Sequence, residues 1–330
     1  CGRGIALVVD SARRLLNTVT DGDVRRAILA NLDTESPVSA LLEQLEGARP
    51  TTVPVGTSND EVLHLMRQRG LRHIPIVDDT NCVVDLLELT DLVPEESELS
   101  ASAMIMAGGY GKRLRPLTDT LPKPMLPVGG RPLLELIIEK LRHSGIRDVH
   151  LATHYRGEVI EDHFADGEEF GVDIRYIRET EPLGTAGALG LLEDLDHPLL
   201  VINGDILTDV DPRALLHYHM DHKADMTVAV KEYELTVPYG TVETEGSRIT
   251  DISEKPLVRC FINAGLYLIA PSVFRRIPRG DACDMPDLIR RLLAEGRPVV
   301  SFPIRESWLD VGQRADYEKA LRIASEEKSH

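Results

Sequence analysis

The sequence predicts an α/β protein with two domains, in which a small α+β domain precedes a larger one built on a mixed, mostly parallel sheet. The chain has 330 residues, which exceeds one ordinary domain and allows a sizeable core. Its first part, up to Asp91, carries a degenerate internal repeat. From Ala103 onward, short apolar strands alternate with helical stretches, which is the pattern of strands joined by crossover helices.

Composition and charge exclude several classes of protein. With 42% hydrophobic and 28% charged residues the chain is typical of a globular protein, and its net charge of −17 would repel a phosphate backbone, so nucleic acid is not an expected partner. No apolar run could span a bilayer and no leader opens the chain, so we expect neither a membrane protein nor a secreted one. The four cysteines lie far apart without paired spacing, which favours a reducing, cytoplasmic location over a disulfide framework or a zinc site.

The internal repeat has an offset of 68 residues. Residues 6–10 match residues 74–78, and Asp23 matches Asp91 at the same offset. Each copy is expected to form strand, turn, strand and helix. The second copy has an additional earlier strand and helix, which in the first copy would precede Cys1, so we expect a truncated first repeat and a native chain that begins roughly 20 residues earlier.

The repeat resembles paired CBS domains, which often bind adenine nucleotides between their copies. The family pattern places a Thr three residues before an Asp for ribose and phosphate contacts, and Thr20 and Asp23 keep it. The second copy has Glu88 in place of the Thr, and a carboxylate opposes a phosphate. The resemblance therefore implies at most one site for AMP or ATP, and a purely structural or dimerising module is the alternative.

A polar, acidic segment opened by Pro94 predicts an interdomain linker over residues 94–101, which leaves the CBS pair at 1–93 and the second domain at 102–330. In the second domain the ligands of a parallel sheet are expected at the carboxyl ends of its strands. The expected strands are 104–106, 149–152 and 199–202, the expected helix is 132–143, and 226–230, 240–244 and 263–269 have antiparallel spacing. We expect these last segments to form a mixed extension that covers the site.

A glycine-rich loop follows the first strand of the second domain. Ala107, Gly108, Gly109 and Gly111 would let backbone N–H groups approach a polyphosphate, and Arg113 would add a forked cationic donor. The spacing fits neither a P-loop nor a dinucleotide fingerprint. A second cation, Lys123, follows between two prolines that stiffen its backbone.

The run from Met106 to Val128, with its Arg-Pro-Leu-Thr and Pro-Lys-Pro elements, resembles the signature of the sugar nucleotidylyltransferases. This family includes glucose-1-phosphate thymidylyl and uridylyl enzymes and mannose-1-phosphate guanylyltransferases. The resemblance extends from about Ala103 to about Ala320. It implies a Rossmann-like, GT-A-like nucleotidyltransferase domain.

The other family motifs follow in order along the chain. By resemblance, Gly184, Thr185 and Ala186 would pack on the nucleobase and ribose. Asp205, directly after an apolar strand, and Asp310 would together hold Mg²⁺, whose preferred ligands are oxygens. The residues implied for the sugar phosphate are Tyr239, Gly240, Glu254, Lys255 and Asn263.

The reaction implied is attack of a sugar-1-phosphate oxygen on the α-phosphorus of an NTP, which yields an NDP-sugar and pyrophosphate. This nucleophile is already ionised at neutral pH, so catalysis would rest on positioning and charge neutralisation. We expect Arg113 and Mg²⁺ to act on the triphosphate, while Lys123 and Lys255 restrain the two anions.

Base and sugar are less determined by the motifs. Residues 284–288 and the attached CBS pair resemble a sub-group that uses GTP with glucosamine-, mannose- or heptose-1-phosphate, so we expect guanylyl transfer, with thymidylyl or uridylyl transfer as alternatives. A catalytically silent nucleotide sensor and an enzyme acting on a molybdopterin or isoprenoid precursor are further alternatives. The CBS pair implies regulation by adenine nucleotides and a homo-oligomer.

Overall fold

The computed structural model describes residues 4–33, 36–44, 50–92, 101–193, 195–274, 276–277 and 279–327. The chain divides into two compact units, Cys1–Ser97 and Glu98–His330. Of the expected linker, residues 94–100 lie outside the described residues. No helix in the described ranges is long and apolar enough to cross a membrane.

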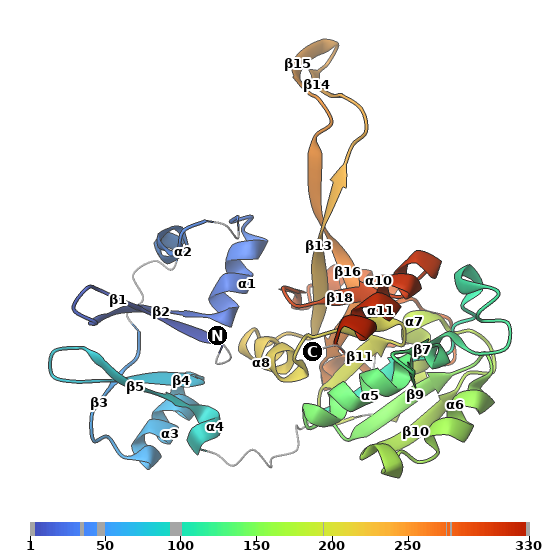
Figure 1. The fold of residues 1–330 in the computed structure, drawn as a ribbon, viewed down its shortest axis with the longest axis horizontal. Helices are drawn as coiled ribbons and strands as arrows, with labels where there is room; N and C mark the ends of the chain where they lie inside the picture. Colours follow the sequence, from blue (N-terminus) through green and yellow to red (C-terminus); the bar gives the residue numbers. More distant parts are fainter. Residues whose placement is uncertain are drawn as a thin grey trace. The chain divides into compact units, whose positions relative to one another are not determined.

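The N-terminal unit contains two copies of a strand–strand–helix structure (Figure 1). The first copy is β1 (Ile5–Val9), β2 (Leu15–Thr20) and α1 (Asp21–Leu29), and the second is β4 (His73–Val77), β5 (Val83–Glu88) and α4 (Leu89–Leu92). Each strand of the second copy begins and ends 68 residues after its counterpart. The unit also contains α2 (Val38–Gln44), β3 (Val53–Pro54), which pairs in parallel with β4, and α3 (Asn59–Arg69).

The two copies meet around a pseudo-twofold axis. Arg14 and Cys82 occupy equivalent positions and face one another in an antiparallel bridge. The backbone N–H of Leu15 donates to the carbonyl of Asn81 (2.9 Å), and the equivalent N–H of Val83 donates to that of Arg13 (3.3 Å). These contacts join the two copies edge to edge within one compact unit.

The C-terminal unit is organised around a seven-stranded mixed sheet, which confirms the predicted α/β class. The strand order is β10-β9-β6-β11-β16-β13-β17, and the β10-β9-β6-β11 half is parallel throughout. β16 is antiparallel to both of its neighbours, and β17 is parallel to β13. The strands are β6 (Ser102–Met106), β9 (Asp148–Thr153), β10 (Asp173–Arg178), β11 (Leu199–Asn203), β13 (Met226–Thr236), β16 (Leu257–Ile269) and β17 (Val299–Pro303).

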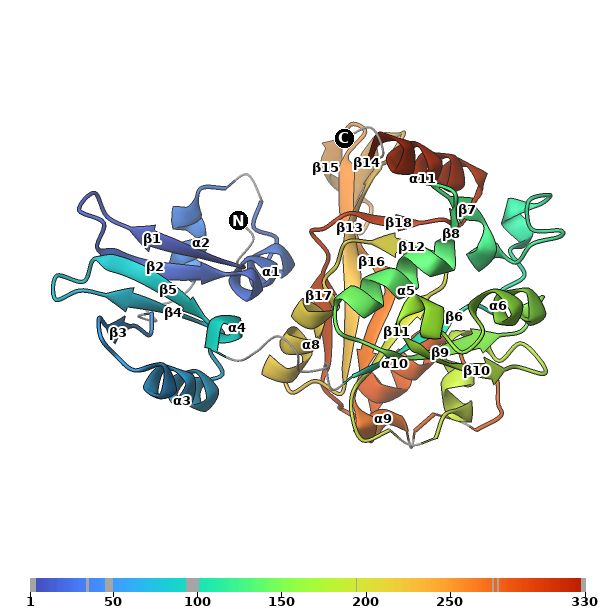
Figure 2. The same cartoon turned by 60° about the horizontal axis from the view of Figure 1, so that its bottom comes forward.

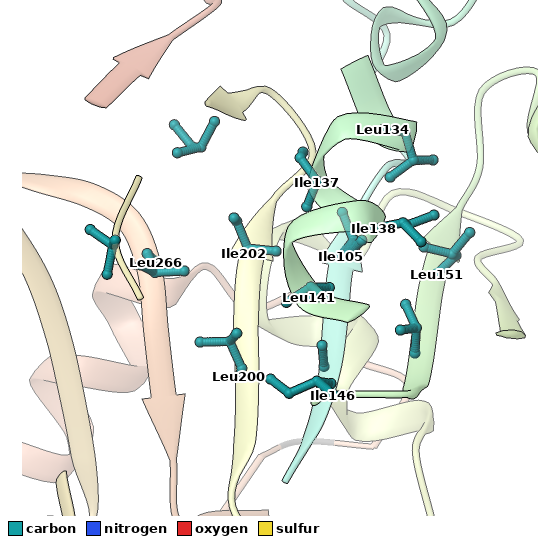
Figure 3. Packing of buried hydrophobic residues seen from close by; sticks show 14 of the residues in the cluster. Ile105, Leu134, Ile137, Ile138, Leu141, Ile146, Leu151, Leu200, Ile202 and Leu266 are labelled. Atoms are coloured by element: carbon teal, nitrogen blue, oxygen red, sulfur yellow. The ribbon is translucent and has the colours of Figure 1, made fainter. Parts of the chain in front are cut away.

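Helices cover both faces of this sheet because alternate strand residues point to opposite sides. Ile105 of β6 and Ile202 of β11 pack under α5, as Figure 3 shows, whereas Met104 and Val201 pack with α10 on the other face. The first face carries α5 (Leu133–His143), α6 (Gly157–Phe164) and α8 (Pro212–Asp221). The second carries α7 (Gly184–Gly187), η4 (Ala188–Leu191), α9 (Pro271–Phe274) and α10 (Met285–Ala294).

A third hydrophobic cluster lies at the end of the sheet where the chemistry is expected. Leu114, Leu126, Leu309 and Tyr317 belong to it, so it joins the glycine-rich loop to two segments far along the chain. The elements around it are η1 (Lys112–Leu114), η2 (Lys123–Met125), β7 (Pro127–Val128), β8 (Arg131–Pro132), β12 (Ile206–Thr208), β18 (Trp308–Asp310) and α11 (Arg314–Glu327), and η3 (Glu168–Phe170) lies elsewhere in the unit.

The outer parts of β13 and β16 form a two-stranded ribbon, tipped by β14 (Thr241–Glu245) and β15 (Arg248–Ser253), that projects from the sheet (Figures 1 and 2). Of the segments expected to cover the site, 226–230 and 263–269 lie in or next to the central sheet, and only 240–244 stands away on the ribbon. The change occurs where Val228 pairs with Tyr267 but Val230 pairs with Asn263. Gly265, in the resulting bulge, has a φ of 70°, which a glycine adopts at little cost.

Candidate active site

The glycine-rich loop leaves β6 at the carboxyl end of the parallel strands. Gly111 has a φ of 60°, and a Cβ at this position would lie 2.8 Å from the Thr118 side chain and 3.2 Å from Lys123 Cβ. The Thr118 hydroxyl donates to the Gly111 carbonyl (2.9 Å). The loop is therefore folded tightly against the segment that carries Lys123, and only glycine fits there.

The other side of the loop contacts the ends of β9 and β10. A Cβ on Gly108 would lie 3.2 Å from Glu179 Oε1 and 3.2 Å from His154 Cβ. The Tyr110 hydroxyl and His154 Nε2 are 3.1 Å apart, and His154 Nδ1 is 2.8 Å from the Glu179 carbonyl. Three consecutive parallel strands thus contribute to one surface around Gly108.

Lys123 is buried, with 9% of its surface exposed. It opens the short helix η2, and Pro122 and Pro124 flank it. Its ammonium group donates to Asp205 Oδ2 in an ion pair that is largely shielded from solvent. The prolines and this contact hold the cation at one position.

Asp205 and Asp310 are brought together by backbone pairing. β12 runs antiparallel to β18 with Ile206 opposite Asp310, and the N–H of Val311 donates to the carbonyl of Asp205 (2.9 Å). Gly204 lets the same turn approach the start of the glycine-rich loop, since a Cβ there would lie 2.8 Å from the Met106 carbonyl. The two carboxylates, Lys123 and the glycine-rich loop therefore share one end of the sheet.

Nearby cations only partly neutralise the two carboxylates at this end of the sheet. Burial raises the pKa of Asp310, the charge of Asp205 raises it further, and Lys123 and Arg113 oppose the shift. Asp310 Oδ1 is buried and has no hydrogen-bond partner among the described residues. Two adjacent carboxylates with an unpartnered oxygen fit a hard divalent cation. The described residues contain no group of three or more His, Cys, Asp or Glu that could hold a metal, so such a cation would need ligands from substrate and water.

The loop predicted to contact the nucleobase packs against the start of α10. Gly184 has a φ of 79°, and a Cβ there would lie 2.6 Å from Asp284 Oδ1. The N–H groups of Ala186 and Gly187 both donate to the Cys283 carbonyl (2.9 Å), and the Thr185 hydroxyl accepts from Met285 N (2.8 Å). The small residues of this loop thus serve close backbone packing on the 283–285 segment.

Glu179 is a candidate that the sequence reasoning missed. It directly follows β10, its Oε2 accepts from the N–H of Leu183 (2.9 Å), and its Oε1 faces Gly108. Burial raises the pKa of this carboxyl. The feature of the sequence that could have identified Glu179 is an acidic residue at the carboxyl end of a parallel strand, five residues before Gly184.

The five expected sugar-phosphate residues separate into two groups. Asn263 lies at the base of the ribbon, where its Oδ1 accepts from Gly265 N (3.0 Å) and Gly265 packs on Asn203, two residues before Asp205. Tyr239, Gly240, Glu254 and Lys255 lie together toward the ribbon's tip. Eight residues of extended chain separate Lys255 from Asn263, or about 26 Å at the usual rise. The structure therefore does not bring this second group to the carboxylate pair.

Thr20 and Asp23 form a capping box at the start of α1. The Thr20 hydroxyl donates to Asp23 Oδ2 (2.6 Å), and the Thr20 N–H donates to the same oxygen (2.7 Å). Asp23 Oδ1 is paired with Arg26. Both residues thus have a structural role at a helix N-terminus, where backbone N–H groups also favour anions.

Two family models match the chain. The nucleotidyl transferase model matches residues 102–327, and the CBS domain model matches residues 42–98. The second match confirms the N-terminal resemblance over the second copy of the repeat.

Curated relatives include mannose-1-phosphate guanyltransferases. The enzyme from Emericella nidulans is 37% identical over 225 residues, 65% of this chain and 62% of the relative. That from Yarrowia lipolytica is 38% identical over 223 residues, 65% of this chain and 61% of the relative. The chain thus spans less than two thirds of the length of these relatives.

Solved structures have the same fold. A putative glucose-1-phosphate thymidylyltransferase from Bacillus anthracis, in complex with sucrose, is similar at a TM-score of 0.55 and 27% identity, covering 68% of this chain and 95% of that one. HddC from Yersinia pseudotuberculosis, complexed with GMP-PN, is similar at a TM-score of 0.54 and 24% identity, covering 67% and 98%. The second likeness concerns the fold alone.

Proposed function

This chain belongs to the nucleotidyl transferase family, and from that premise we propose that it joins an NTP to a sugar-1-phosphate, forming an NDP-sugar and pyrophosphate. One observation carries the proposal: Lys123, Asp205 and Asp310 meet beside a glycine-rich loop at the carboxyl end of the parallel strands. The arrangement suits transfer of a phosphorylated group, because it combines backbone donors, a buried cation and a pair of carboxylates.

In this mechanism the protein positions two anions and neutralises their charge. The N–H groups of the loop and Arg113 would hold the triphosphate, and Lys123 would restrain the phosphate groups that react. Asp205 and Asp310 would hold Mg²⁺, which supplies charge neutralisation at the triphosphate when bound. The sugar phosphate is ionised at neutral pH, so no side chain needs to remove a proton.

For the base we propose guanine, with Glu179 as its reader. Guanine presents two adjacent donors, N1–H and its amino group, and a carboxylate accepts from both. Glu179 lies between Gly108 and Leu183 on the surface where the nucleotide would rest. The names of the relatives, mannose-1-phosphate guanyltransferases, support the same base.

For the acceptor we propose mannose-1-phosphate, again following the relatives, with glucosamine- and heptose-1-phosphate as the other sugars to test. Tyr239, Gly240, Glu254 and Lys255 would reach it only if the ribbon bends toward the carboxylate pair. Pivoting at the base is insufficient, because Asn263 and Asp205 both lie near the pivot and a straight ribbon keeps Lys255 about 26 Å away. We propose that the ribbon bends between Asn263 and Lys255 when the sugar phosphate binds.

The test is pyrophosphate release by the full chain with Mg²⁺, crossing GTP, UTP, dTTP, CTP and ATP against a panel of hexose- and heptose-1-phosphates. We expect turnover with GTP and mannose-1-phosphate that is lost in Asp205→Ala. Release with another pair would correct the base or the sugar. No release with any pair would contradict the proposal and favour a silent nucleotide sensor or a non-sugar acceptor.

We also propose that an adenine nucleotide near Thr20 and Asp23 regulates the enzyme, which requires unequal binding to two conformations. Deletion of residues 1–98 should abolish any response to AMP and ATP while retaining turnover.

The described cysteines, Cys82, Cys260 and Cys283, are free, which supports the expected cytoplasmic location. A homo-oligomer remains part of the proposal, and light scattering of the full chain tests it.

A further inference from the structure

Lys123 is placed where it can act as a substitute for the metal. Its ammonium group is bonded to Asp205 Oδ2, and Lys123 and Asp205 are both substantially buried. The neighbouring carboxylate oxygen, Asp310 Oδ1, is buried and has no partner among the described residues. One carboxylate of the pair, Asp205, is thus neutralised by a cation of the protein. The other, Asp310, has an oxygen that a ligand could bind.

The surrounding structure holds this arrangement in place. The flanking prolines and η2 fix the Lys123 backbone, and Lys123 Cβ lies 3.2 Å from the position that a Cβ on Gly111 would occupy. Asp205 is fixed in turn by the pairing of β12 with β18. Only the flexible end of the lysine side chain is free to change partner, and a four-carbon stem with a compact charge suits such a change.

The balance of charge supplies a reason for the change. Two carboxylates and one ammonium leave one net negative charge among these three groups, which opposes the approach of a triphosphate. Adding a divalent cation would make the same group of charges net positive. An ammonium released from Asp205 would then lie beside the incoming phosphates, for which it is a suitable donor.

We propose that Lys123 is a resident counter-cation which neutralises Asp205 in the metal-free protein and which a divalent cation displaces, freeing the ammonium group for phosphate. This proposal rests on the metal site of the proposed function. Its test needs neither a sugar phosphate nor turnover, so the two can fail separately.

The first measurement is Mn²⁺ binding to the full chain by electron paramagnetic resonance, without nucleotide. Lys123→Met should bind Mn²⁺ about tenfold more tightly than the unmodified chain, because the ion no longer competes with the ammonium group. Lys123→Arg, which keeps the charge, should stay within about twofold. Lys112→Met is the matched control for general charge, and it should change the affinity by about twofold or less, since Lys112 is exposed and screened.

The second measurement is trace acetylation of lysines, read by mass spectrometry. Mn²⁺ should increase the modification rate of Lys123 several-fold, because the amine released from Asp205 can react, while exposed Lys112 serves as the internal control. Adding a nucleotide should then protect Lys123 again.

Two results would overturn the proposal. One is equal Mn²⁺ affinity in the unmodified chain and in Lys123→Met, confirmed as folded by circular dichroism. The other is a Lys123 that stays unreactive while Mn²⁺ is bound, because the ammonium group would then have kept Asp205. Absence of Mn²⁺ binding in every variant would instead refute the metal site itself.

Discussion

The phosphate-binding end of the site and the ribbon that carries the expected sugar-binding residues differ in how they are held in place. Around Asp205, four separate segments pack against one another, and Gly111 and Gly204 leave no room for a Cβ. On the ribbon, Tyr239 is 74% exposed and Ile252 is 67% exposed. An isolated two-stranded ribbon is marginally stable in water. One half of the site is therefore preorganised, and we expect the other half to be organised by its ligand.

The largest expected effect concerns the preorganised half. Asp205→Asn and Asp310→Asn should each lower kcat on the order of 100- to 1,000-fold, because each removes a charged ligand of the proposed metal. Steady-state pyrophosphate release measures this. Asp209→Asn is the matched control, since Asp209 lies four residues away and pairs with Lys140 on the surface, and it should retain activity. Equal losses in all three variants would contradict a specific role for the pair.

The next largest effect concerns the ribbon. Lys255→Ala should raise the KM for the sugar phosphate by roughly 10- to 100-fold with little change in the KM for the NTP, because it removes a charge-assisted contact to one substrate only. Arg248→Ala, at the exposed tip, is the matched control. A Lys255→Ala enzyme with unaltered kinetics would show that the ribbon does not bend to the acceptor.

Mixing two impaired variants, assayed at a sugar-phosphate concentration well below the KM of Lys255→Ala, shows which copy's site the ribbon serves. If the ribbon bends onto the carboxylate pair of its own chain, an equal mixture of Lys255→Ala and Asp205→Asn should have no more activity than the variants measured separately. Recovery of activity on mixing would mean that the ribbon completes the site of a second copy, since only a mixed assembly contains an intact set of residues.

A smaller effect is expected at the base-reading position. Glu179→Gln should lower kcat/KM for GTP by roughly 10- to 100-fold, because an amide cannot accept from both guanine donors. The preference of the enzyme for GTP over UTP should become smaller. Glu181→Gln, an exposed acid two residues further on, is the control. An unchanged ratio of GTP to UTP use would remove Glu179 from base selection.

The smallest effect compares two glycines with the same backbone conformation. Gly111 and Gly246 have φ values of 60° and 63°, but a Cβ on Gly111 would meet Thr118 at 2.8 Å, whereas one on Gly246 would meet none of the described atoms within 4 Å. Gly246→Ala should cost about 1 kcal/mol of conformational strain, and Gly111→Ala about 1–3 kcal/mol more from overpacking. Urea denaturation of both variants measures the difference, and equal values would argue that the loop is not tightly packed.

The local pattern of apolar and polar residues was sufficient to predict much of the fold. The 68-residue offset predicted two copies of strand, turn, strand and helix, and the observed strands repeat at this offset, because each copy forms from neighbouring residues. The helix expected at 132–143 is observed as Leu133–His143, since its apolar spacing already specifies one buried face. The strand before the glycine-rich loop was also predicted, from its run of apolar residues.

The members of the candidate site were proposed from the sequence, whereas its geometry comes from the structure. Nothing in the chain between Asp205 and Asp310 indicates that β12 pairs with β18, and Glu179 belongs to no motif that spacing alone reveals. The covering role expected for residues 240–244 was wrong for this structure, because alternation predicts a strand but not the direction in which a ribbon leaves its sheet.

The sequence by itself determined the two-part organisation, the order of the motifs and the types of residue available for chemistry, because these depend on neighbours along the chain. Tertiary structure alone decided that Lys123 bonds Asp205, that Asp310 keeps an oxygen with no hydrogen-bond partner in the described part of the chain, and that Lys255 stands apart. These arrangements depend on strand pairing and packing between distant segments. Their energies arise only when the whole sheet is assembled.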